Sequence, residues 1–237
     1  MELRPGGPHY LEIIHMPQRS DSANDSEIRL SLERFSWKGD DRSTGWKRRD
    51  ELSKGLIAAL ESEDADKLME ALERIHTWGL PGRLPVSVRN NKERVLALLK
   101  RAVLDGPSAD QVAELLSFDR IGIATVSKWI GLLDQKQFAI FDSRVSVALR
   151  MLREKASRCF PVLPRRRTGK HTPWPSDRVS SDDMALYYLR YLAHVRDVGH
   201  AMDLHPSEVE MALFMIGDQS CNDKEGWKRD RGPLLAF

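Results

Sequence analysis

The sequence predicts a mainly α-helical protein with a small β or irregular segment at its N-terminus. From Asp50 onward, apolar residues recur every three or four positions, as in helices that bury one face. Before that point Ile28–Leu32 alternates apolar and polar residues, which is typical of a half-buried strand, and Tyr10–Ile14 is a candidate partner strand. We find no internal repeat of fixed period. We therefore expect an N-terminal segment, residues 1–50, packed on a helical domain, residues 51–237.

Seven apolar stripes place the expected helices. Pro206 and Gly217 mark the start and the end of the last one, because proline suits a first helical turn and glycine a helix end. Cys159–Ser180 contains four prolines and a glycine and is expected to be a long basic loop. The stripes cover residues 52–60, 68–75, 95–102, 112–116, 145–152, 184–198 and 209–216.

The composition excludes several classes of protein. Hydrophobic residues make up 41% of the 237 residues and charged residues 30%, with a mean hydropathy of −0.46, unlike collagen-like, mucin-like or largely disordered chains. No apolar run reaches the roughly 18 residues of a membrane span, and the first ten residues lack the apolar region of a secretory signal. We expect a cytoplasmic monomer without a membrane partner.

The cysteines and histidines give no sign of a metal site. The only two cysteines, Cys159 and Cys221, are far apart, and no CxxC, CxxH or HExxH pattern is present. His194, His200 and His205 have the wrong spacing to share one face of a helix. We therefore expect neither a metal nor a cofactor.

Charge is unevenly distributed along the chain, although its net value is only +2. Pro164–Arg178 holds five cations and one anion, and Arg42–Arg49 and Lys224–Arg231 are also basic. Glu61–Glu73 is acidic, with two Asp and four Glu against a single Lys. This asymmetry suits a face for a polyanion such as nucleic acid, and an ordinary solvated surface is the alternative.

A helical hairpin with a glycine at its junction carries the first functional signal. A short helix, Asp110–Ser117, leads to a second helix that opens at Gly122, Ile123 and Ala124. Backbone N–H groups at such a helix start bind phosphate well, and a plain αα-hairpin is the alternative. Asp142 follows twenty residues after Gly122, at the start of the next helix, where it can lie beside that phosphate site.

Together these residues resemble the helix-hairpin-helix DNA glycosylases, especially the 8-oxoguanine DNA glycosylase branch. Ile121–Ala124 stands where that family has its Pro-Gly-Val-Gly hairpin, and Phe141–Val145 where it has its essential aspartate. Val88–Val95 is similar to the asparagine-bearing helix start that reaches into the gap left by a flipped base. Met211–Phe214 is similar to the late helix whose phenylalanine stacks on that base, and the four motifs keep their order over residues 75–217.

The resemblance implies a DNA glycosylase that binds double-stranded DNA, flips out a damaged or modified base and cleaves its N-glycosidic bond. The setting is either DNA repair or attack on modified foreign (phage) DNA. In this interpretation Gly122, Ile123 and Ala124 hold the phosphate backbone, Asp142 drives bond cleavage and Phe214 contacts the base. One alternative is a non-catalytic helix-hairpin-helix DNA-binding protein, and another is an all-α interaction module without a DNA role.

The sequence departs from the family at two positions of the hairpin. Ala124 replaces the second glycine, and Val126 stands where bifunctional members have a nucleophilic lysine. Lys128 lies one helical turn after Ala124, on the same face, so it can point towards the pocket. The four-cysteine cluster of some relatives is absent. We therefore expect a monofunctional enzyme, with at most weak lyase activity through Lys128.

Two further groups of residues are candidate DNA contacts. Asn90 and Asn91 match the asparagine-bearing helix start, and each can instead be an ordinary N-cap. Arg165, Arg166 and Arg167 form the most basic part of the long loop. They are candidate phosphate contacts, and a solvated loop is the alternative.

Glu210 lies one helical turn before Phe214, where the resembling branch has an amide. An ionised carboxylate only accepts hydrogen bonds, so a pocket role would favour donor-rich bases, namely an oxidised guanine or a modified cytosine. It would disfavour hypoxanthine-like or thymine-like edges. Ordinary roles stay open: an N-cap for Asp142, a solvated surface position for Lys128 and Glu210, and a core position for Phe214.

Overall fold

The computed structural model describes residues 22–37, 40–80, 82–152, 160–161, 163 and 179–222. Within these ranges the chain forms ten helices and one short antiparallel ladder, packed around one hydrophobic core, which confirms the mainly α fold class. The elements are α1 (Ser22–Glu33), β1 (Ser36–Trp37), β2 (Asp40–Asp41), α2 (Arg42–Glu61), α3 (Ala65–Gly79), α4 (Val86–Asn90), α5 (Lys92–Asp105), α6 (Ala109–Leu116), α7 (Ile123–Gly131), α8 (Ser143–Leu152), α9 (Ser181–Met202) and α10 (Pro206–Asn222).

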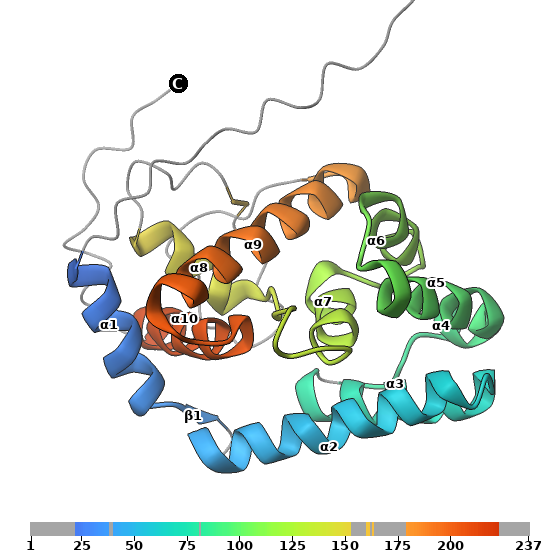
Figure 1. Ribbon diagram of the computed structural model, residues 1–237. Coiled ribbons are helices and arrows are strands. Elements are labelled where there is room, and N and C mark those ends of the chain that lie inside the picture. Colours follow the sequence, from blue (N-terminus) through green and yellow to red (C-terminus); the bar gives the residue numbers. More distant parts are fainter. Residues whose placement is uncertain are drawn as a thin grey trace, which may run out of the picture.

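Helix α7 lies at the centre of the molecule (Figure 1). On one side of it α8 and α10 pack against each other and α1 packs on α10; on the other side lie α4, α5 and α6. The long α9 contacts both α6 and α10, and α2 runs beside α3 along the edge below α7. Every residue from Thr125 to Gly131 is buried, so the side chains of α7 contact both sides of the molecule.

All seven predicted stripes lie within helices, namely α2, α3, α5, α6, α8, α9 and α10. Polar residues cap several of their starts, because the first backbone N–H groups of a helix have no partner inside it. Asp41 accepts from the backbone N–H of Thr44 before α2, and Ser180 accepts from that of Asp183 before α9. Ser108 and Gln111 form a capping box at the start of α6.

The strand predicted at Ile28–Leu32 is wrong, although the N-terminal segment, residues 1–50, does contain a short β ladder. The expected strand Ile28–Leu32 lies inside α1. Ile28 and Leu32 are buried, whereas Leu30, which a strand would place on the same face, is 45% exposed. The two-residue strands β1 and β2 lie later in the chain, and Tyr10–Ile14 lies outside the described residues.

The physical reason is that the same residues also fit a helical period. Ile28, Ser31, Leu32 and Phe35 are spaced by three and four residues, and all four are buried, with α1 packed on α10. The predicted boundary at residue 50 falls inside α2, so the described residues before it do not form a separate β unit.

Gly217 does not end the last helix. Helix α10 begins at Pro206, as predicted, but passes through Gly217 and continues to Asn222. A Cβ atom at Gly217 would lie 1.9 Å from the carbonyl oxygen of Arg144 and 3.0 Å from its Cα. The missing side chain therefore lets α10 approach the start of α8 closely.

This contact predicts a clear difference between two glycine substitutions. Gly217→Ala should lower the free energy of unfolding by about 2 kcal/mol or more, because backbone atoms of α8 have to move. Gly55→Ala is the matched control: it lies inside α2 with no atom within 4 Å of its Cβ position, so it should stabilise by about 0.5–1 kcal/mol. Urea unfolding measures both, and equal effects would contradict the close packing of α10 on α8.

Candidate active site

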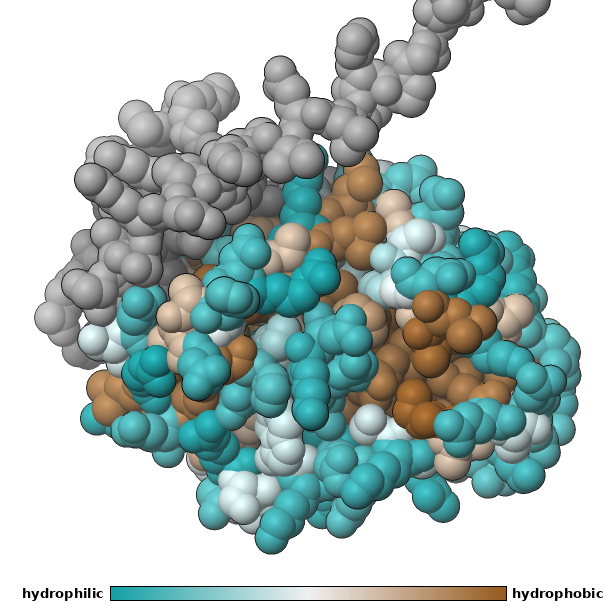
Figure 2. Space-filling view, in the orientation of Figure 1, coloured by the Kyte–Doolittle hydropathy of each residue, from teal (hydrophilic) through white to brown (hydrophobic). Residues whose placement is uncertain are grey.

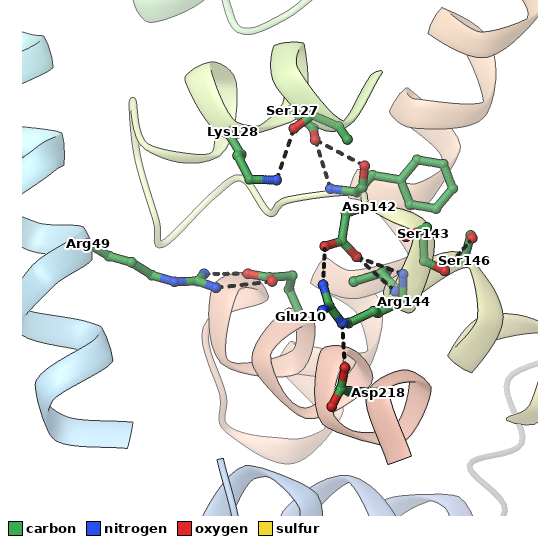
Figure 3. Close-up of polar contacts among 12 residues, drawn as sticks. Arg49, Ser127, Lys128, Asp142, Ser143, Arg144, Ser146, Glu210 and Asp218 are labelled. Atoms are coloured by element: carbon green, nitrogen blue, oxygen red, sulfur yellow. Dashed lines mark hydrogen bonds and ion pairs between the residues drawn. The ribbon is translucent and has the colours of Figure 1, made fainter. Parts of the chain in front are cut away.

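A small cavity of about 30 Å³ lies where α7, α2, α10 and the start of α8 meet. It brings together four residues that the sequence singled out: Lys128, Asp142, Glu210 and Phe214. Figure 3 shows the charged members of this group, which come from α7, the residue before α8, and α10, with the Glu210 carboxylate directed at Arg49. The lining residues are Phe35, Arg49, Trp78, Gly79, Lys128, Ile140, Asp142, Arg144, Glu210 and Phe214.

Asp142 caps α8 with one of its carboxylate oxygens. Oδ1 accepts the backbone N–H groups of Arg144 at 2.9 Å and Val145 at 3.1 Å, so the N-cap role is confirmed. Oδ2 lies 3.9 Å from Nη1 of Arg144 and makes no hydrogen bond within the described residues. The cap and a chemical role are therefore compatible, since each uses a different oxygen.

The segment that leads to Asp142 is fixed from two sides. The hydroxyl of Ser127 on α7 accepts from the backbone N–H of Phe141 at 3.0 Å and donates to its carbonyl oxygen at 3.2 Å (Figure 3). On α9, Tyr188 donates to the carbonyl of Ala139 at 3.0 Å and Tyr191 to that of Ile140 at 2.9 Å. These buried bonds hold Asp142 in place before any ligand binds.

Lys128 is buried beside Asp142, so its predicted surface alternative is wrong. The side chain is only 5% exposed, and Nζ donates to the carbonyl of Ala124 at 3.1 Å. Burial lowers the pKa of Lys128, and the negative charges of Asp142 and Glu210 act against this shift. Val126, at the family's nucleophile position, is fully buried and is not among the residues that line the cavity.

Gly79 makes room for this lysine. A Cβ atom at Gly79 would lie 2.5 Å from Cε of Lys128 and 2.7 Å from its Cδ. The present position of the Lys128 side chain therefore requires a residue without a side chain at the end of α3. No local sequence pattern indicates this requirement, because the contact joins two distant helices.

Glu210 forms a buried ion pair with Arg49, a residue that sequence analysis counted only within a basic stretch. Nη1 of Arg49 donates to Oε2 of Glu210, and Nη2 donates to Oε1 at 3.1 Å (Figure 3). Burial raises the pKa of Glu210, and the Arg49 guanidinium counteracts this rise. The surface alternative for Glu210 is wrong, and its carboxylate is not an unengaged acceptor. Arg49 follows the buried Gly45 by four residues and precedes the buried Leu56 by seven, a spacing that could have shown that it faces the core.

Phe214 belongs to the core and to the cavity lining at once. It is buried, and its ring lies 6.2 Å from that of Phe35. The guanidinium of Arg144 lies 4.7 Å from its ring centre, and Nε of Arg144 donates to Asp218 at 2.6 Å. A base that stacked on this face of Phe214 would therefore have to displace Arg144.

The predicted hairpin is present between α6 and α7. Gly122 is the exposed N-cap residue of α7 with an extended backbone, and no side chain caps this helix start. The first backbone N–H groups of α7 therefore point away from the helix, as an anion site requires. Ser87 on α4 donates to the carbonyl of Asp119 at 2.8 Å and so ties the turn to α4.

The predicted asparagine contacts are not among the residues that line the cavity. Asn90 is exposed at the end of α4. Asn91 occupies the N-cap position of α5, but its side chain makes no cap bond and donates back to the carbonyl of Ser87 at 2.7 Å. Neither residue lines the cavity. The three loop arginines, Arg165, Arg166 and Arg167, lie outside the described residues.

Comparison of the chain with protein-family models, curated proteins and solved structures gives no match. The resemblance to the helix-hairpin-helix glycosylases therefore rests on the residues quoted above. In the part of the chain that the structure describes, no helix has the length and apolar character to cross a membrane. Within the same ranges, no group of three or more His, Cys, Asp or Glu side chains is placed to hold a metal ion.

The burial of Lys128 predicts how stability depends on pH. Between its lowered pKa in the folded state and its ordinary value, the unfolded state binds more protons than the folded state. The free energy of unfolding of the wild type should therefore rise with pH across this window. Lys128→Met removes the buried charge, so it should be more stable than the wild type by roughly 1 kcal/mol near neutral pH. This difference should shrink towards about pH 10.

Urea unfolding at a series of pH values measures this difference. Lys54→Met is the matched control, because Lys54 is an exposed lysine of α2 that pairs with Asp50. The control should change the free energy of unfolding by less than about 0.5 kcal/mol. A difference between Lys128→Met and the wild type that stayed constant with pH would contradict the burial of this ammonium group.

Proposed function

We propose that the protein is a DNA glycosylase that extrudes a damaged or modified base and cleaves its N-glycosidic bond. The observation that carries the proposal is the state of Asp142. One of its oxygens caps α8, while the other accepts no hydrogen bond from the described residues, in a cavity that also holds the buried amine of Lys128. A carboxylate fixed in this way, partly shielded from solvent, suits a reaction in which positive charge develops beside it.

Cleavage of the N-glycosidic bond creates such a charge. The base leaves with the electron pair of the bond, and the sugar passes through an oxocarbenium-like state at C1′. Asp142 stabilises this positive charge and takes a proton from the water molecule that adds to C1′. The products are a free base, after it gains a proton, and an abasic sugar.

DNA binding in this proposal uses surfaces outside the cavity. The backbone N–H groups at the start of α7, from Gly122 to Ala124, hold a phosphate of the target strand. Base extrusion is required because C1′ and the base edge are shielded within the stacked duplex. Arg165, Arg166 and Arg167 add sequence-independent phosphate contacts. The biological setting is repair or attack on modified foreign DNA.

Lys128 is the candidate nucleophile for a second reaction, cleavage of the DNA strand at the abasic site. An amine with a lowered pKa is neutral more often and can form a Schiff base with an abasic sugar. Nζ of Lys128 is held by its hydrogen bond to the carbonyl of Ala124, and Lys128 lies two residues after the position of the family's nucleophilic lysine. Both features disfavour attack of this amine on C1′. We therefore propose a mainly hydrolytic enzyme with weak lyase activity. The competing function is a non-catalytic DNA-binding protein with the same hairpin.

A panel of duplexes separates these two functions. Each duplex carries one modified base, including oxidised guanines and modified cytosines, and free base and alkali-labile sites are detected after incubation with the wild-type protein. Release of at least one base supports the glycosylase. Salt-sensitive duplex binding without release of any base would support the non-catalytic alternative.

Asp142→Asn should reduce base release by at least about 100-fold while the protein still folds and binds DNA. The charge is lost, but the cap is preserved because asparagine caps a helix about as well as aspartate. Single-turnover base release, with duplex affinity measured in parallel, tests this expectation.

Asp64→Asn is the matched control for the loss of Asp142. Asp64 caps α3 through the backbone N–H groups of Asp66 and Lys67 and does not line the cavity. The same chemical change at this cap should leave base release within about twofold of the wild type, in keeping with the small effects of most surface substitutions. Full activity of Asp142→Asn would remove the basis of the proposed function.

Borohydride trapping on an abasic duplex tests Lys128. The wild type should give a weak covalent adduct, and Lys128→Met should give none, because only a Schiff base is reduced to a stable link. A strong adduct that disappears in Lys128→Met would show that the amine reaches C1′ more readily than we propose. An adduct that persists in the variant would assign the reaction to another amine.

A further inference from the structure

Arg49 enters the cavity with hydrogen-bond donors that no described residue accepts. A guanidinium carries five N–H groups, and the pair with Glu210 engages one on each terminal nitrogen. No other acceptor for Arg49 exists among the described residues, although its side chain is only 6% exposed. Trp78 lies against the guanidinium, with 5.8 Å between the ring centre and Cζ. Among the described residues the guanidinium is thus buried, oriented and only partly paired.

Lys128 adds further unused hydrogen-bond donors to the cavity. Lys128 has three donors and uses one, on the carbonyl of Ala124. The charged lining consists of three cations, Arg49, Lys128 and Arg144, against two anions, Asp142 and Glu210. Glu210 lies one turn before Phe214 on α10, and both of its oxygens already accept from Arg49. Apart from Oδ2 of Asp142, which serves the reacting sugar in the proposed function, the cavity therefore offers more unused donors than acceptors.

We propose that Arg49 determines base specificity: held by Glu210, it donates to a carbonyl oxygen on the base edge that enters the cavity. Bases with a carbonyl at that place are selected over bases with an amino group there. This inference rests on the proposed glycosylase function and specifies its substrate class. It reverses the expectation from sequence that an unpaired Glu210 favours donor-rich edges and rejects hypoxanthine-like ones.

The physical reason is the cost of leaving a buried charged donor unpaired. Arginine matches adjacent acceptors on a base, such as the 6-oxygen and N7 of a 6-oxopurine, whereas an amino group would place donor against donor. The cavity, at about 30 Å³, holds only a water molecule or two. Its lining must therefore open for a base, and the base must then replace the hydrogen bonds of any water that it displaces.

Free hypoxanthine and free adenine provide a matched pair of probes. Both have N7; position 6 is a carbonyl in hypoxanthine and an amino group in adenine, and N1 carries a hydrogen in hypoxanthine but not in adenine. Calorimetric titration of the 237-residue protein should show at least about tenfold tighter binding of hypoxanthine, because only hypoxanthine offers the guanidinium a carbonyl acceptor at position 6 beside N7.

The variant that tests Arg49 is Arg49→Met/Glu210→Met. Replacing both partners leaves no buried unpaired charge, so the protein should fold, whereas Arg49→Met alone would leave the Glu210 carboxylate without its partner. The double variant should lose the preference for hypoxanthine. Arg48→Met is the matched control, because Arg48 is the exposed neighbour on α2 and does not line the cavity; it should keep the full preference.

Equal binding of the two bases by the wild type, or an unchanged preference in the double variant, would overturn the role of Arg49. Absence of binding by either base would overturn it too, because the cavity would then not admit a base. The glycosylase proposal fails by a different readout, namely when no duplex in the panel loses a base. A preference for hypoxanthine in a protein that releases no base would uphold Arg49 as the reader and reject the enzyme.

Discussion

Arg49 and Glu210 form an ion pair in the interior of the molecule, where the removal of either partner would leave a buried charge uncompensated. The pair joins α2 to α10, two helices that are far apart in the sequence. Arg49 on α2 and Glu210 and Phe214 on α10 line the cavity, together with groups from other elements such as Trp78 on α3, Lys128 on α7 and Asp142 before α8. The positions of Arg49 and Glu210 in the cavity therefore depend on this contact. Most of the visible surface is hydrophilic, with apolar residues gathered in limited areas (Figure 2), whereas Arg49, Lys128 and Glu210 of the site are buried.

Asp142 shows how the fold prepares one group for chemistry. The hydroxyl of Ser127 and the phenols of Tyr188 and Tyr191 fix the backbone just before it, and its own Oδ1 fixes the start of α8. Gly217 then lets α10 approach that helix start. These constraints order the carboxylate in the ligand-free protein, so that little conformational entropy remains to be lost when a substrate binds.

The sequence was a good guide to the helices because each buries one face, and a buried face leaves a local period. It misled at Ile28–Leu32, where alternation and the helical period coincide over five residues. It also misled at Gly217, because a glycine that ends a helix and one that admits a neighbouring helix look alike along the chain.

The site was only partly predictable. Asp142, Lys128, Glu210 and Phe214 were identified from local patterns and from the resemblance, and the structure brings them together. Arg49 was missed because its partner lies 161 residues away, and no local pattern tells which carboxylate neutralises a buried cation. The room that Gly79 gives to Lys128 is a contact of the same long-range kind, and it appears only when the helices are packed.

The central claim is that this cavity receives the deoxyribose and base of an extruded nucleotide. A crystal structure of the protein with a duplex that contains a tetrahydrofuran abasic site tests it, whichever base the enzyme excises. We predict that the abasic sugar lies at the cavity with its C1′ facing Asp142, and that a neighbouring phosphate accepts from the backbone N–H groups at the start of α7. An abasic sugar that remains within the duplex, or binds away from Asp142, would contradict the claim.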